Sequence, residues 1–78
     1  MGAGGLPRVN GRDVVRALSR GAFVLSHVKG SHHYLRAPGG RVVIVPVHAG
    51  RTVPLGTLRS ILRQSGLTGA ELSALLGR

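Results

Sequence analysis

This chain of 78 residues contains no cysteine and very few acidic residues. It has 2 aspartates and glutamates in total, compared with 11 lysines and arginines. The lack of cysteine excludes disulfides and thiolate metal sites and permits a reducing compartment, so we expect a cytoplasmic protein. No apolar run approaches the roughly 20 residues that cross a bilayer, so we expect no contact with membranes. The formal net charge of +9 favours a polyanion as partner, because binding releases the counterions condensed on it. Nucleic acid, an acidic protein or both are the expected partners.

Hydrophobic periodicity and capping residues predict a helix at each end of the domain. A short amphipathic helix is expected over Gly11–Arg20, with Asn10 as its cap. Pro54 can open a second helix whose leucines recur at three- and four-residue steps and which Gly66 closes. The segment 68–71 is a capping-box pattern that predicts one further short helix.

Between these helices, β-branched and aromatic residues predict strands at 22–29, 31–37 and 41–47, joined by tight glycine turns. We therefore expect an α+β fold of α-β-β-β-α type. Its three-stranded antiparallel sheet carries the helices on one face and leaves the other open, as in double-stranded RNA-binding domains. We expect residues 1–8 to form a flexible tail and residues 9–78 a single domain.

The segment Lys29-Gly-Ser-His-His-Tyr34 contains the residues that we expect to act on a substrate. Imidazole, with an unperturbed pKa of about 6.5, can accept and donate protons near neutrality without a metal. RNA can be cut without a cofactor when its 2′-hydroxyl attacks the adjacent phosphate, which needs a base, an acid and cations near the phosphate. Lys29, Arg36 and Arg41 are candidates for those cations, and unpaired bases can stack on Tyr34.

Alternation along the second strand separates its two histidines. His32, Tyr34 and Arg36 should share one face, and His33 should share the other with Leu35, which is core-like. This favours His32 as catalyst on the open face. A one-residue shift in register, or a bulge near Gly30, would give that role to His33 instead.

The four histidines do not predict a metal site. Adjacent His32 and His33 point apart on a strand, and Asp13 and Glu71 are the only carboxylates besides the C-terminus. His27 and His48 have no spacing that makes either more than an accessory, although His48 follows a Pro46-Val47 pair. We expect neither a metal nor a small-molecule cofactor.

The chain resembles the HicA toxin family, also called YcfA-like, over about residues 10–76. The matching marks are Gly30-Ser-His32 followed by an aromatic, Pro38-Gly-Gly-Arg41, Pro46-Val-His48, Gly56-Thr-Leu-Arg-Ser-Ile-Leu-Arg63 and Gly66-Leu-Thr68. The resemblance implies the toxin of a type II toxin–antitoxin system, a metal-independent endoribonuclease that cuts mRNA. It also implies a HicB-type antitoxin as protein partner. His32 matches the catalytic position, and His33 matches relatives whose histidine lies one step later.

From these observations we expect His32, or alternatively His33, to be catalytic. The expected RNA-binding residues are Lys29, Ser31, Tyr34, Arg36, Arg41 and His48. The competing hypotheses are an RNA-binding module of the same fold that cuts nothing, and a DNA-contacting or structural partner protein.

Overall fold

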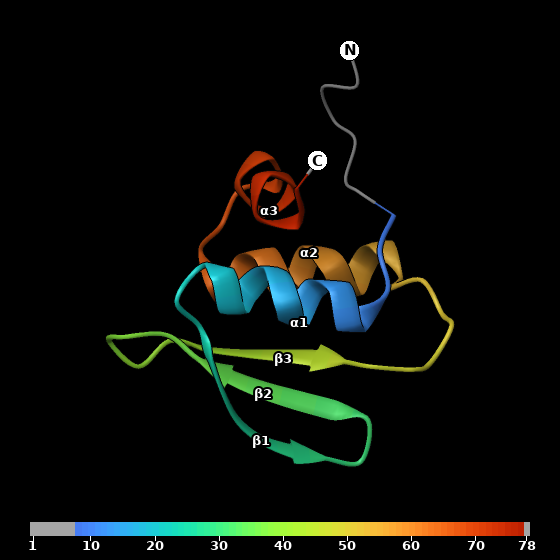
Figure 1. Ribbon diagram of the computed structural model, residues 1–78, viewed down its shortest axis with the longest axis horizontal. Coiled ribbons are helices and arrows are strands. Elements are labelled where there is room, and N and C mark those ends of the chain that lie inside the picture. The colour runs from blue at the N-terminus through green and yellow to red at the C-terminus, as the bar shows by residue number, and fades with distance from the viewer. Residues whose placement is uncertain (1–7, 78) are drawn as a thin grey trace.

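The computed structural model describes residues 8–77, so the predicted N-terminal tail, apart from Arg8, lies outside the described residues. The elements follow the expected order of one helix, three strands and two helices (Figure 1). They are α1 (Gly11–Arg20), β1 (Val24–Lys29), β2 (His32–Arg36), β3 (Val42–Pro46), α2 (Leu55–Ser65) and α3 (Gly69–Leu76). The predicted α+β class is confirmed, although each strand is shorter than predicted at one end or at both.

Helix α1 begins and ends where the sequence predicted. The Asp13 N–H donates to Asn10 Oδ1 at 2.8 Å, which satisfies one of the unpaired amides of the first turn. At the other end the Gly21 N–H donates to the carbonyl oxygens of Ala17 and Leu18. The buried residues of the helix form one stripe, which packs into the core and holds the helix against the sheet.

Helices α2 and α3 are separated by Gly66, whose φ of 76° ends α2 in the left-handed conformation. The predicted capping box is present at the start of α3. The Thr68 N–H donates to Glu71 Oε1 at 2.8 Å, and the Glu71 N–H donates to Thr68 Oγ1 at 3.0 Å. Helix α3 lies beyond α1, on the side away from the sheet (Figure 1), and Arg20 Nη1 donates to its Leu75 carbonyl at 2.8 Å.

The strands form one antiparallel sheet in the order β1-β2-β3, with β2 in the centre. All three helices lie on one side of it, and β1 is the strand farthest from them (Figure 1). The core lies between sheet and helices and consists of Val9, Val14, Ala17, Leu18, Phe23, Leu35, Val43, Val45, Val53, Leu58, Ile61 and Leu72. Among residues 8–77, no helix is both long and apolar enough to cross a membrane.

The two edges of the sheet differ. On β3, the Ile44 N–H donates to Gln64 Oε1 of α2 at 2.9 Å, and Pro46 has no N–H to offer. Every residue of β1 is exposed. Ser31 accepts from the Val47 N–H at 2.7 Å, so by alternation His33 also turns its backbone groups towards β3. Val28, opposite His33, therefore turns its own N–H and C=O outwards at the free edge of β1.

The α1–β1 connection contains one strained residue. Ala22 has a φ of 73°, a region that costs an L-residue roughly 1–2 kcal/mol and costs glycine little. Because glycine also loses more backbone entropy on folding, we expect Ala22→Gly to raise the free energy of unfolding by about 0.5 kcal/mol. Urea denaturation followed by circular dichroism measures the free energy of unfolding. An unchanged or lower midpoint would show that Ala22 is not strained.

Candidate nucleic-acid interface

The sheet face away from the helices carries the polar side chains of β2. His32 and Arg36 are exposed and Tyr34 is half-buried on this face, whereas Leu35 is fully buried on the other. The strand contains no bulge and pairs in continuous register with β3 from His32 to Arg36. The predicted separation of His32 from His33 onto opposite faces is therefore confirmed, and we call the His32 side the open face.

His32 lies at one end of the open face, next to the β1–β2 turn. Its partner on β1 is Lys29, and its partner on β3 is Pro46. Side chains directly opposite each other on neighbouring strands have Cβ atoms about 5 Å apart, so the imidazole and the ammonium can act on one phosphate. Both side chains are exposed, so a polyanion can reach them without any opening of the structure.

The middle of the open face is a pair of stacked rings. His27 of β1 lies opposite Tyr34, and the ring centroids are 4.3 Å apart with an angle of 9° between the planes. His27 Nδ1 also shares a hydrogen bond of 3.0 Å with Ser26 Oγ. One face of the Tyr34 ring is thus already occupied. His27 joins the site, although the sequence suggested only an accessory role for it.

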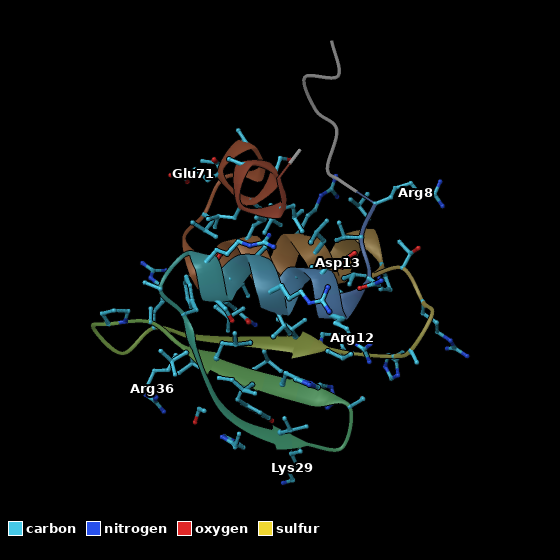
Figure 2. All side chains as sticks on the ribbon, in the orientation of Figure 1. Arg8, Arg12, Asp13, Lys29, Arg36 and Glu71 are labelled. Atoms are coloured by element: carbon cyan, nitrogen blue, oxygen red, sulfur yellow. The ribbon has the colours of Figure 1, made fainter. Side chains whose placement is uncertain are left out.

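Arg36 lies at the far end of the open face, four residues or about 13 Å along the strand from His32. Figure 2 shows Lys29 and Arg36 pointing away from the helices, from opposite ends of the sheet. The open face therefore carries a cation at each end and stacked rings between them. Such a surface suits a nucleic acid strand, whose phosphates need cations and whose bases need flat partners.

Arg41, predicted to bind RNA, lies outside this arrangement. It precedes β3 at the end of the sheet remote from His32, and its Nη1 donates to the Gln64 carbonyl at the end of α2, at 3.3 Å. Its guanidinium also lies 3.2 Å from where a Cβ on Gly66 would be. A cation at the negative end of a helix stabilises it, so the structure gives Arg41 a helix-capping contact.

Ser31 and His48 lie at the His32 end of the sheet. The Ser31 carbonyl accepts from the Val47 N–H, which extends the ladder by one pair, and its side chain is half-buried. His48 is exposed in the loop after β3, where its carbonyl accepts from the Arg51 N–H at 3.0 Å. Both are therefore near the end of the strand that carries His32, but neither is a strand partner of it.

The family described as "HicA toxin of bacterial toxin-antitoxin" matches residues 11–67, well over half of the chain. This chain belongs to the HicA toxin family. No curated protein matches it. Membership makes the chain a toxin-type component of a bacterial toxin–antitoxin system and implies an antitoxin as its partner. The matched segment holds every candidate residue named above and ends before α3, which covers α1.

In this HicA-family chain, His33 occupies the helix side of β2, half-buried between Val28 and Val45. Its Nδ1 is buried and has no hydrogen-bond partner, alone among the buried side-chain nitrogens and oxygens of residues 8–77. A buried polar atom without a partner costs about 1–3 kcal/mol. His33 therefore faces the core at an energetic cost, while His32 faces solvent.

We expect His33→Leu to raise the free energy of unfolding by about 1 kcal/mol, because leucine has a similar volume and leaves no polar atom unpaired. Thermal or urea denaturation of the two proteins measures the change. A loss of stability would show that the ring nitrogen has a partner in solution that leucine cannot replace.

The HicA-family site has no feature of a metal centre within the described part of the chain. No group of three or more histidine or carboxylate side chains there lies close enough to hold an ion.

Proposed function

We propose that this chain is the toxin of a type II system and acts as a metal-independent endoribonuclease on mRNA, with His32 as proton-transfer catalyst. The observation that carries the proposal is the exposed pair of His32 and Lys29, directly opposite each other on the open face of a HicA-family domain. An imidazole can act as base and then, once protonated, as acid, and the cation beside it can stabilise the phosphate during cleavage through the ribose 2′-hydroxyl.

In the proposed reaction His32 accepts the proton of the 2′-hydroxyl while that oxygen attacks the adjacent phosphorus. The bond from phosphorus to the 5′-oxygen breaks, and the leaving oxygen takes a proton from solvent or from the imidazolium formed. Lys29, opposite His32, stabilises the negative charge that grows on the phosphate oxygens. The products are a 2′,3′-cyclic phosphate and a 5′-hydroxyl, with no metal or other cofactor consumed.

Single-stranded mRNA is the proposed substrate, because the bases of a duplex are stacked and its major groove is too narrow for side chains. The antitoxin is proposed to be a HicB-type protein with an acidic surface that covers the open face. The net charge of +9 supports both partners, since each presents negative charge.

The test is incubation of the purified protein with single-stranded RNA in excess chelator, followed by analysis of the product ends. Cleavage that leaves cyclic phosphates and 5′-hydroxyls supports the proposal. RNA that is bound but stays whole would favour the non-catalytic RNA-binding module, and cleavage that the chelator stops would refute the metal-free mechanism. In cells, expression should arrest growth, and co-expression of the neighbouring antitoxin reading frame should restore it.

A further inference from the structure

A shallow apolar pocket of about 380 Å³ lies at the end of the sheet remote from His32. It is lined by Val24, Ser26, Arg36, Ala37 and Pro38. Three of these residues present apolar surface, Ser26 adds a hydroxyl, and Arg36 is the one charged residue of the five. Its volume lies near the lower end of the range typical of small-molecule sites. These walls suit a mostly apolar group with negative charge beside it.

An irregularity in β1 shapes the pocket. The register with β2 shifts between Leu25 and His27, so Ser26 is an extra residue without a partner. The shift turns Leu25 towards the helix side, opposite Leu35, and places Val24 opposite Arg36 on the open face. Val24 is 66% exposed, compared with 51% for Leu55 and 49% for Val28. The bulge therefore places the apolar side chain of Val24 beside the guanidinium of Arg36.

The pocket continues the proposed path of the RNA. Arg36 belongs both to the pocket and to the open face that carries His32 and Tyr34. His32 and Arg36 are about 13 Å apart along the strand, so the pocket is too far to hold the nucleotide whose 2′-hydroxyl reacts. A ligand there would be a neighbouring part of the same strand.

We propose that this pocket binds one unstacked base of single-stranded RNA, with the phosphate of that nucleotide on Arg36. The base lies against Val24 and Pro38, and the hydroxyl of the bulged Ser26 can make one hydrogen bond to the base edge besides the bond that it shares with His27 Nδ1. The assignment of the ligand as RNA rests on the proposed function, whereas the apolar wall beside a guanidinium is a property of the structure alone. Contacts of this kind bind a single strand through its exposed bases and require no double helix.

The test uses nuclear magnetic resonance on the ¹⁵N-labelled His32→Ala protein, which lacks the proposed catalyst. The probes are the four nucleoside 5′-monophosphates and, as a control without a base, ribose 5-phosphate. We expect at least one nucleotide to shift the amides of Val24, Ser26 and Ala37, and ribose 5-phosphate, which can reach only Arg36 through its phosphate, to shift them much less. Equal shifts from ribose 5-phosphate, or unmoved pocket amides with all four nucleotides, would overturn the proposal.

Two matched variants distinguish binding of a base in the pocket from a general effect of charge near Arg36. Val24 and Val42 both lie opposite Arg36, one on each neighbouring strand, and only Val24 lines the pocket. Both are exposed, so Val24→Glu and Val42→Glu should fold normally while each adds a carboxylate beside Arg36. We expect Val24→Glu to weaken nucleotide binding at least fivefold more than Val42→Glu does. Equal weakening would mean that Arg36 binds the phosphate and that the pocket holds no base.

The readout does not depend on RNA cleavage. Base binding by the His32→Ala protein, with no cleavage by the unchanged protein, would support the pocket and contradict the nuclease. Cleavage by the unchanged protein, with no shifts of the pocket amides, would contradict only the pocket. Shifts of the pocket amides by the purified antitoxin, with none from any nucleotide, would assign the pocket to the protein partner and overturn the base site.

Discussion

RNA cleavage is expected to fall by about 10²- to 10⁴-fold when His32 is replaced by alanine, the range in which a positioned acid or base contributes. His32 is exposed on the open face, so its removal creates no cavity and should leave the fold intact. Lys29 and Arg36 remain in place, so affinity for RNA should stay within about twofold, because phosphate contacts dominate it. Cleavage rates at saturating RNA, together with a binding isotherm, measure both quantities.

The matched control is His33→Ala, the same change one residue along the strand and on the opposite face. Its side chain lies on the core side, so we expect cleavage within a few-fold of the unchanged protein, provided that the variant is assayed well below its unfolding temperature. Loss of cleavage in this variant, with activity kept in His32→Ala, would transfer the catalytic role to His33. Undiminished cleavage in both would remove the Gly30-Ser-His segment from the mechanism.

Stability is expected to fall by about 1–3 kcal/mol when Gly11 becomes alanine, the range for overpacking a tight contact. Gly11 is buried at the start of α1, where a Cβ would collide with the Pro46 carbonyl oxygen and approach the Val47 Cα to 2.9 Å. These are backbone atoms, which cannot rotate away. Because Pro46 is the strand partner of His32, the collision also affects the His32 end of the open face. Urea denaturation measures the loss.

Gly56→Ala is the control for the change in backbone entropy. Gly56 lies in α2, and a Cβ there would have no atom within 4 Å. The same substitution should therefore stabilise the protein by about 0.5–1 kcal/mol, since alanine is the better helix former. If both variants were stabilised alike, the contact between Gly11 and β3 would not exist in solution.

The fold was predictable because each element carries its own local signals. Asn10 and the Thr68-to-Glu71 box mark helix starts by hydrogen bonds that span three residues, and β2 alternates without interruption. Local rules of this kind need no knowledge of the rest of the chain. They placed His32 on the open face correctly.

Features that depend on contacts between two separate segments could not be predicted from the sequence. Uniform alternation in β1 would put Leu25 on the same face as His27, and only the pairing with β2 reveals the shift at Ser26 that separates them. The stacking of His27 on Tyr34 follows from that pairing. The contact of Arg41 with the end of α2 joins residues 23 positions apart, so the position of Arg41 near the histidines in sequence does not predict it.

The unequal edges of the sheet have a consequence for how copies of this toxin meet. On β3 the Ile44 N–H is bonded to Gln64 and Pro46 has no N–H, so β1, where Val28 turns its backbone groups outwards, is the edge more open to a strand from another molecule. Mutual repulsion between chains of +9, reinforced by Lys29 at the end of β1, opposes such pairing. Dissolved ions weaken this repulsion, so we expect it to oppose pairing of two copies less as ionic strength rises.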